Sequence, residues 1–478
     1  MARPLSMRWV YAALGVFVAG FALLPPRAFL VVDEERYASQ AVAFAHGGLA
    51  VDGAGVVFPA THLRTISDYP PGTALLQTPF VWAGGWRAAA LLSVVALVVM
   101  TLATARMLRD EGRSPAFALC IPGFFGAAFF GRIAMSDVPS GAIVAVALWL
   151  LWRGERNGRT SLTAAAAFLA GASLVFRETL VLLLLPPLIA SAWRSGRWVP
   201  AVLAGVAGAL LRLVLSQWLF GSPLYVRSSG YGFSIVHLWH TVPVYAVVLL
   251  GMFPLGALLP FFYRGAWRGA VVTAVALYVA VFLFYGYDSV RENGLAKGVI
   301  LGSRFMIPAL PLLVLMAADV WPRWMQAARV SEVARARIAV AGAATVIAMC
   351  AGVHAIAHRQ EGTSLALVRS IYQHTRADMP VITNTNETLK YLSPSYGPRR
   401  LYLRYQLDSS SVVDFSRRLG PMSIVLLDRN DSDLFRREQD DNERFLAMVR
   451  ARCALHRIAD ERPAAWARVR VFELSSCG

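Results

Sequence analysis

The chain has 478 residues, of which 57% are hydrophobic and 16% charged, and its mean hydropathy is +0.52. This composition excludes an ordinary soluble domain and favours a protein with many membrane-spanning helices. The net charge of +17 would suit a nucleic-acid-binding protein, but the arginines occur in short clusters between apolar runs. We therefore expect no nucleic-acid partner and attribute the charge to positive-inside topology.

Apolar runs recur from the N-terminus to about His358, and each approaches the roughly 20 residues that cross a bilayer. They predict about eleven membrane helices. The expected ranges are 9–31, 86–106, 115–131, 138–152, 161–176, 179–193, 198–220, 240–262, 268–286, 304–321 and 337–357. The first run is longer than a signal-peptide core, and Pro25 and Pro26 stand where small residues would mark a cleavage site, so we expect a retained helix.

The polar residues between these runs alternate in sign. Arginine clusters at 106–113, 153–159 and 323–337 fall in loops that we expect to be cytoplasmic, whereas the intervening loops carry acids, among them Asp33, Asp137 and Asp288. An odd number of helices then sends the C-terminus outward. The sequence predicts a multi-pass protein of the plasma (inner) membrane whose C-terminal domain is periplasmic or otherwise extracytoplasmic.

The first outer loop, residues 33–85, is too polar to span a bilayer and too long for a turn. Residues 33–47 and 67–85 are expected to form two helices at the membrane interface, the second opened by Pro70 and Pro71. This loop and the apolar runs make up a membrane domain of residues 1–358.

The remaining residues, 359–478, are richer in charge and contain short strand-like segments. They are MPVITNT, RLYLRY, MSIVLLD and RVRVFEL, separated by helical stretches. This pattern predicts a small soluble α/β domain, whose role is left open. Cys453 and Cys477 could pair in an oxidising compartment.

Asp33, Glu34 and Glu35 directly follow the first apolar run. Carboxylates at a helix start commonly bind free backbone amides and complement the helix dipole. A carboxylate held at the membrane surface is also well placed to remove a proton, and the two roles are compatible.

Several motifs, in this order along the chain, resemble the GT-C glycosyltransferases. They are the acidic pair Asp33-Glu34, the following Arg36-Tyr37-Ala38, YPPG at 69–72, RIAMSD at 132–137 and GSRFMIPALP at 302–311. Within that superfamily the chain is most similar to the group of protein O-mannosyltransferases and lipid A aminoarabinose transferases. The resemblance implies a GT-C fold, polytopic and α-helical, with a C-terminal extracytoplasmic α/β domain.

The resemblance also implies an activity. A sugar would pass from a polyprenyl (undecaprenyl) monophosphate to a hydroxyl of an extracytoplasmic acceptor, which is a lipid, a glycan or a protein, with inversion at the anomeric carbon. Asp33 is the implied catalytic base. Arg304, expected at the start of the tenth helix, is implied to hold the leaving phosphate, although an arginine there could also anchor a helix end at the interface.

The implied substrate-binding residues are Glu34, Arg36, Tyr37, Arg64, Tyr69, Arg132, Asp137 and Arg304. Several aminoarabinose transferases carry a lysine near the proline pair, where this chain has Asp68 and Tyr69. Arg64 is the nearest arginine, and His62 lies close to it. This departure leaves the donor sugar open.

Other polar residues permit two interpretations each. Arg132 and Asp137 could pair with each other or contact substrate, and the same holds for Arg177 and Glu178. Arg212 lies within an apolar run and is expected to face the protein interior or a cavity. The pair His237 and His240 could ligate a metal or belong to an aromatic interface belt; we expect no cofactor, and a divalent metal ion stays open.

Two other functions share these features. A transporter or flippase of polyprenyl-linked sugars would also have many helices, but no matching halves of the kind found in many transporters are evident, and the acids gather at one face. A non-catalytic membrane scaffold would not need the long first loop.

Overall fold

The computed structural model describes residues 7–48, 55–56, 69–225, 232–265, 267–384, 400–404, 409–429 and 433–477. Its contacts divide the chain into two compact units. The helical unit contains residues 1–25, 70–76 and 90–356, and the sheet unit contains residues 26–69, 77–89 and 357–478.

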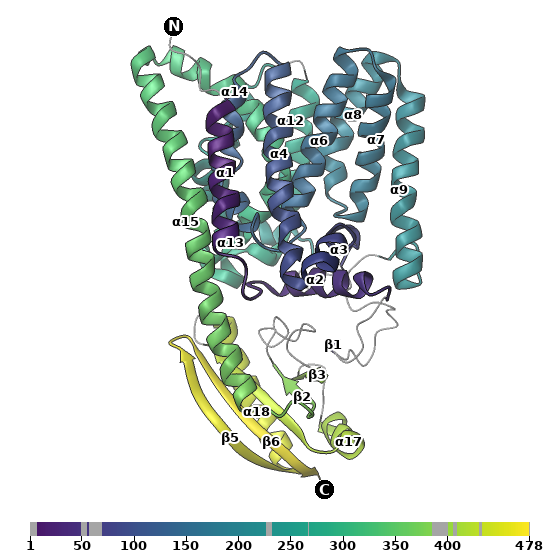
Figure 1. Ribbon diagram of the computed structural model, residues 1–478, viewed down its shortest axis with the longest axis vertical. Helices are drawn as coiled ribbons and strands as arrows, with labels where there is room; N and C mark the ends of the chain where they lie inside the picture. The colour runs from purple at the N-terminus through teal and green to yellow at the C-terminus, as the bar shows by residue number, and fades with distance from the viewer. Residues whose placement is uncertain are drawn as a thin grey trace. The chain divides into compact units, whose positions relative to one another are not determined.

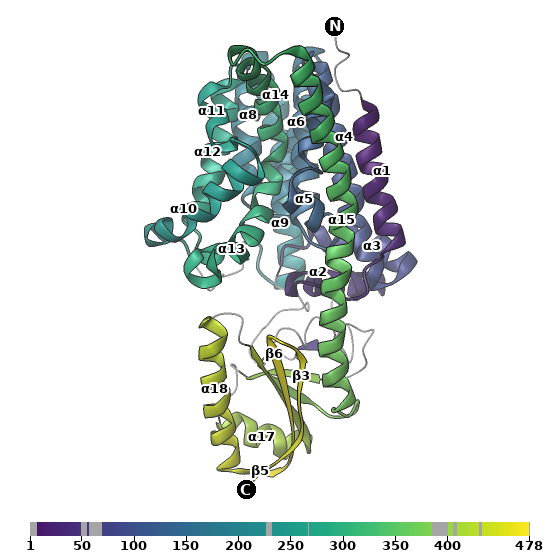
Figure 2. The ribbon, with the colours of Figure 1, turned by 90° about the vertical axis from the view of Figure 1, so that its left-hand side faces the viewer.

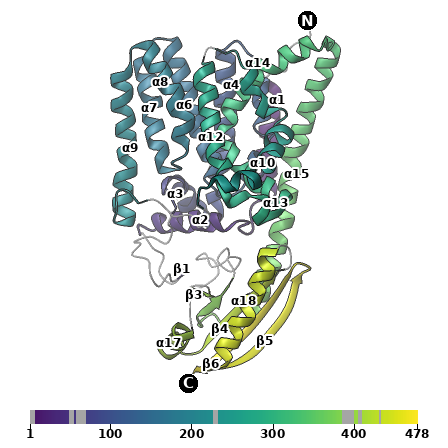
Figure 3. The same cartoon turned by 180° about the vertical axis from the view of Figure 1, so that it is seen from behind.

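The helical unit is a bundle whose helices run alternately up and down (Figure 1, Figure 3). Its longer helices are α1 (Met7–Leu23), α4 (Leu91–Asp110), α6 (Asp137–Arg156), α7 (Thr160–Ala172), α8 (Leu180–Ser195), α9 (Trp198–Phe220), α12 (Arg268–Leu283), α13 (Val290–Met306), α14 (Leu310–Ala327) and α15 (Glu332–Gln373). Within the described residues, 5 helical segments are long and apolar enough to cross a membrane, and shorter apolar helices accompany them.

Two expected membrane helices are interrupted. The range 115–131 contains a 3-10 helix, η2 (Pro115–Cys120), and a short helix, α5 (Phe125–Phe130), separated at Pro122 and Gly123. The range 240–262 contains α10 (Leu238–Ala246), a π-helical segment η5 (Val247–Met252) and α11 (Leu259–Phe262). The segment η5 ends at Met252, because Phe253 is extended, with φ −113° and ψ 96°, and the ring of the following Pro254 disfavours helical dihedrals at that residue.

The predicted start of a third membrane helix was wrong. The predicted helix 304–321 is preceded by α13, so Arg304 lies in the last turn of one helix and does not begin the next. A 3-10 turn, η8 (Ile307–Ala309), separates α13 from α14 at Pro308, because the proline ring cannot continue the α-helix of residues before it.

The segment 33–85, predicted to be the first outer loop, contains both expected helices, α2 (Val32–Ala45) and α3 (Gly72–Gly84). Pro70 and Pro71 directly precede α3, as their fixed φ and missing amide hydrogen favour.

A six-stranded mixed sheet forms the centre of the C-terminal region, in the order β1-β3-β2-β4-β6-β5. The strands are β1 (Gly55–Val56), β2 (Val381–Thr383), β3 (Arg400–Leu403), β4 (Met422–Arg429), β5 (Cys453–Ala464) and β6 (Ala467–Cys477). β1 to β4 are parallel, and β6 pairs antiparallel with both β4 and β5. The four predicted strands are confirmed, and β1 and β5 are additions.

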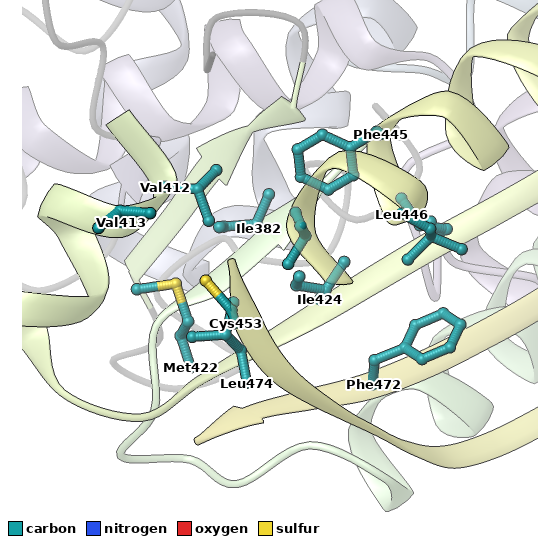
Figure 4. Close-up of a cluster of buried hydrophobic side chains, with 12 residues drawn as sticks. Ile382, Val412, Val413, Met422, Ile424, Phe445, Leu446, Cys453, Phe472 and Leu474 are labelled. Atoms are coloured by element: carbon teal, nitrogen blue, oxygen red, sulfur yellow. The ribbon is translucent and has the colours of Figure 1, made fainter. Parts of the chain in front are cut away.

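Helices cover both faces of this sheet (Figure 2). On one face, α17 (Ser409–Leu419) and α18 (Asp433–Arg450) pack on a core that includes Ile424, Phe445 and Phe472 (Figure 4). On the other face, Leu367 and Ile371 from the last turns of α15 pack on a second cluster. Cys453 and Cys477 form a disulfide between β5 and β6.

Candidate functional site

The Glu34 side chain fixes the start of α2. Val31 is the residue before the helix, and the Glu34 carboxylate accepts hydrogen bonds from the backbone amides of Leu30 at 2.6 Å and Val31 at 3.1 Å. These two hydrogen bonds tie the backbone before α2 to the first turn of the helix. The Glu34 carboxylate, which is almost fully buried, therefore sets the position of the residues beside it.

Asp33 lies one position before Glu34 and has a different partner. The Tyr69 hydroxyl donates a hydrogen bond to Asp33 Oδ1 at 2.5 Å. The ring of Tyr37, one helical turn further along α2, packs on the Tyr69 ring with 5.1 Å between centroids. Asp33 is only half-buried, so its carboxylate is both held in place and accessible.

Glu35, the third carboxylate, is turned into the protein. It is buried and accepts a hydrogen bond from Ser39 Oγ at 3.3 Å. Burial raises the pKa of the Glu35 carboxyl to about 7, opposed by the nearby Arg36 charge and by the Ser39 hydrogen bond. Arg36 is half-buried on the same helix.

A second group of charged residues lies in the helical unit, where Asp137 begins α6. Asp137 is fully buried, and its carboxylate pairs with the Arg177 guanidinium at 2.8 Å. The guanidinium carbon of Arg177 lies 5.4 Å from the centre of the Phe305 ring. The expected alternative pairing between Arg177 and its neighbour Glu178 is replaced by this contact.

Arg304 approaches the same aromatic ring. Its guanidinium carbon lies 4.8 Å from the centre of the Phe305 ring and 5.3 Å from that of Tyr287. Phe282 stacks on Phe305 with 4.8 Å between centroids. Arginine prefers such aromatic surroundings because its planar guanidinium is weakly hydrated.

The Arg304 charge acts on Asp288, an acid in the turn between α12 and α13. Burial raises the pKa of the Asp288 carboxyl to about 6, while the nearby Tyr245 hydroxyl and the Arg304 charge act in the opposite direction. Two glycines of α13 permit this turn to approach. A Cβ on Gly298 would lie 2.7 Å from the Asp288 carbonyl oxygen, and one on Gly302 would lie 2.9 Å from Asp288 Oδ2.

Arg132 contacts α15. It is fully buried and donates from Nη1 to the His354 carbonyl oxygen on α15 at 2.9 Å. The Phe17 ring of α1 packs on the His354 ring, with 4.7 Å between centroids. Arg132 therefore joins the turn after α5 to α15 in the interior of the bundle.

Two further expectations concern polar residues of the apolar runs. Arg212 is buried, as predicted, and pairs with Glu178 at 2.8 Å while donating to the Tyr225 carbonyl at 3.0 Å. The His237 ring packs on Gly286, where an added Cβ would lie 2.7 Å from it. Among the described residues, no three histidine, cysteine or acidic side chains gather as metal ligands would.

The predicted site residues thus fall into two groups. Asp33, Glu34, Tyr37 and Tyr69 come together in the sheet unit, and Asp137 and Arg304 are linked through Arg177 and Phe305 in the helical unit. Arg64 lies outside the described residues, as do His62 and Asp68.

Sequence reasoning missed the aromatic and acidic surroundings of Arg304. Tyr287 and Asp288 belong to the segment YGYDS at 285–289, an aromatic and polar interruption between two apolar runs. That interruption is the signal that could have identified them.

Comparison with known proteins establishes the fold. No protein-family model and no curated protein matches the sequence. The structure is similar to that of ArnT from Cupriavidus metallidurans bound to undecaprenyl phosphate, with a TM-score of 0.61 and 15% identity over 98% of each chain. The same protein in the apo state gives a TM-score of 0.59 and 16% identity over 98% of this chain and 97% of that one.

An oligosaccharyltransferase from Archaeoglobus fulgidus in the apo form matches at a TM-score of 0.48 and 11% identity, over 88% of this chain and 69% of that chain. The likeness to ArnT confirms the fold expected from the motifs. The chain has the GT-C fold, a helical bundle with a C-terminal α/β domain.

Proposed function

We propose that this chain is a membrane glycosyltransferase that moves a sugar from a polyprenyl monophosphate, such as undecaprenyl phosphate, to a hydroxyl of an extracytoplasmic acceptor. The acceptor is a lipid, a glycan or a protein. The observation that carries this proposal is the Asp33 carboxylate, held by Tyr69 at a capped helix start and accessible, in a chain with the fold of ArnT.

Asp33 is the proposed general base. It accepts the proton of the acceptor hydroxyl while that oxygen bonds to the anomeric carbon on the face opposite the phosphate. The bond between the anomeric carbon and the phosphate oxygen breaks, and the phosphate keeps the electron pair. The configuration inverts, and the products are a glycoside and polyprenyl phosphate.

Arg304 is the proposed partner of the leaving phosphate, which gains negative charge as the bond breaks. A guanidinium can donate two parallel hydrogen bonds to phosphate oxygens. Support comes from the burial of the Arg304 side chain and from its contacts with the Tyr287 and Phe305 rings, which restrict the position of the guanidinium.

The other predicted residues have supporting roles in this proposal. Glu34 and Tyr69 position Asp33, and Tyr37 supports the Tyr69 ring. Asp137 holds Arg177 beside Phe305, and Arg132 stabilises the bundle. Arg36 and Arg64 are proposed to contact the sugar phosphate through charge.

The proposal is tested by incubating the purified protein in lipid nanodiscs with a polyprenyl-phosphate sugar and candidate acceptors. The wild-type protein should release polyprenyl phosphate and form a glycosylated product. Asp33→Asn, whose amide oxygen can still accept the Tyr69 hydrogen bond, should lower the rate about 10²- to 10⁴-fold.

Asp378→Asn is the matched control, because it removes an exposed carboxylate that pairs with Arg376 in the C-terminal domain. It should transfer sugar at the wild-type rate. Near-wild-type transfer by Asp33→Asn would remove the base assignment, and movement of the intact donor across the bilayer without product would favour a flippase.

A further inference from the structure

Two short turns at one end of α6 to α9 bring several arginines together. Gly158 and Gly196 adopt positive φ angles of 68° and 67°, which end α6 and α8. The turns touch, because Arg197 Nη1 donates to the Gly154 carbonyl oxygen at 3.4 Å and Arg194 Nη2 pairs with Glu155 Oε1 at 3.4 Å. These ends of the helices lie on the same side of the bundle as the start of α1 (Figure 1).

The two turns carry an excess of positive charge. Residues 153–159 and 193–198 contain five arginines and one glutamate, a net charge of +4. We call this surface the basic patch; its arginines are Arg153, Arg156, Arg159, Arg194 and Arg197.

The neighbouring turn after α4 is different, because its arginines are matched by acids. Asp110 and Glu111 lie among the arginines of 106–113, and Arg113 pairs with Asp319 at 3.1 Å. Asp319 also pairs with Arg323 at 2.8 Å. Acids thus offset much of the positive charge of that turn, whereas the basic patch keeps a net charge of +4, although its Arg156 donates a hydrogen bond to the Asp110 carbonyl oxygen.

Arg159 shows this most directly. It is exposed at the start of α7, and among the described residues its guanidinium has no ion-pair or hydrogen-bond partner. Arg194 and Arg197 are fixed on the adjacent turn by the contacts given above. Three guanidinium groups therefore border one exposed surface whose sequence carries a net positive charge.

Exposed tryptophans flank the basic patch. Trp193 is 84% exposed and Trp198 is 62% exposed. Tryptophan indoles favour the boundary between lipid headgroups and hydrocarbon. From Trp198 the exposed side of α9 continues as an apolar face that includes Val199, Val202, Leu203, Val206 and Leu210.

We propose that the basic patch binds an anionic phospholipid. Arg159, Arg194 and Arg197 would hold the headgroup phosphate, the two tryptophans would lie at the level of its glycerol backbone, and its acyl chains would follow the apolar face of α9. An anionic phospholipid fits because it presents phosphate and hydrocarbon together. This binding site is independent of the proposed glycosyl transfer.

Native mass spectrometry of the full chain, titrated with phosphatidylglycerol, tests the proposal. Arg159→Gln together with Arg197→Gln should raise the Kd for phosphatidylglycerol about 30-fold, since each cation near a membrane surface contributes about a factor of five. Phosphatidylcholine binding should not change. The lysine pair Arg159→Lys and Arg197→Lys should stay within about threefold of wild type, because the attraction is largely one of charge.

The control variant combines Arg329→Gln, in the turn after α14, with Arg337→Gln, in the second turn of α15, and so removes the same charge. It should bind phosphatidylglycerol within about threefold of wild type. Equal losses in both glutamine variants, or none in either, would overturn the proposal, as would complete displacement of the lipid by millimolar inorganic phosphate. Arg159→Gln alone repeats the test in a variant that loses no internal contact.

Discussion

Three consecutive carboxylates at the start of α2 have three different surroundings. Glu34 caps the helix, Asp33 accepts a hydrogen bond from Tyr69, and Glu35 is buried beside Ser39. The helical turn separates them, because adjacent residues on a helix point about 100° apart. One short acidic run therefore supplies a structural residue, an accessible carboxylate and a buried acid.

Glu35 gives a prediction for stability against pH. Its pKa is raised from 4.5 to about 7 in the folded protein, so its protonated form favours folding. The stabilising effect of the proton is complete below pH 4.5 and is lost as the pH rises through 7. Glu35→Gln, which mimics the protonated acid, should match wild type near pH 4.5 and become more stable above pH 7, by on the order of 3 kcal/mol.

Thermal unfolding in detergent at several pH values measures this difference. Glu332→Gln, at the exposed start of α15, is the control and should show no comparable trend. A difference between Glu35→Gln and wild type that stays constant from pH 4.5 to 8 would contradict the prediction.

Arg304 gives a prediction for donor binding. Lysine keeps the charge but lacks the planar group that lies against Tyr287 and Phe305 and can form two parallel hydrogen bonds. Arg304→Lys should lower kcat/KM for the donor at least about 10-fold, and kcat/KM for the acceptor at saturating donor should change less. Arg337→Lys is the control, and equal activity of the two variants would leave Arg304 the role of a helix anchor.

At the scale of elements, the positions of most helices could be predicted, because a long apolar run in a bilayer must satisfy its backbone hydrogen bonds internally and therefore forms a helix. The sequence did not predict that the helices would be interrupted at Pro122 and Pro254. A proline within an apolar run can kink a helix or end it, and packing decides which. Pro186 and Pro187 lie inside the continuous helix α8, so the residue type alone does not determine the outcome.

The missed strand β5 has a different cause. Its sequence, CALHRIADERPA, has charged residues where a half-buried strand would alternate with apolar ones. β5 is an edge strand that pairs only with β6, and its charged exposed residues are typical of edges protected against further pairing. The sequence pattern could not identify it without knowledge of its neighbour.

The approach of α13 to the Asp288 turn gives a prediction at this scale. An alanine at 302 would place its Cβ 2.8 Å from Val244 Cγ1 and 2.9 Å from Asp288 Oδ2, so the helix would have to shift. Gly302→Ala should destabilise the protein by about 1–3 kcal/mol. Gly269→Ala on α12, where no atom lies within 4 Å, should be neutral or slightly stabilising. Equal melting temperatures for the two variants would contradict the predicted close packing.

At the scale of the whole molecule, the fold class was evident from composition and motif order, whereas the pairs within the candidate site were not. Asp33 and Tyr69 are 36 residues apart in the chain, and Asp137 pairs with Arg177, which lies beyond α7 in the sequence. Several arginines were compatible with each acid by charge alone. Only the packing of the helices selects among them.

The orientation of the chain across the membrane gives a prediction at the scale of the whole molecule. The basic patch should face the cytoplasm, and the C-terminal domain, with its disulfide between Cys453 and Cys477, should lie outside. In intact cells, a membrane-impermeant maleimide should label Asp440→Cys but label Asn157→Cys only after permeabilisation. The reverse pattern would invert the proposed topology and place Asp33 on the wrong side for an extracytoplasmic acceptor.

The glycines of α13 have a consequence for how a ligand would meet Arg304. Gly298 and Gly302 let α13 lie directly on the Asp288 turn. The part of α13 that carries Arg304 therefore has little freedom to move. Its orientation is settled when the chain folds, so association with an anion need not restrict it further. We therefore expect the binding site around Arg304 to be preorganised. The main free-energy cost of binding an anion there should be desolvation of the anion, and rearrangement of the protein should cost little.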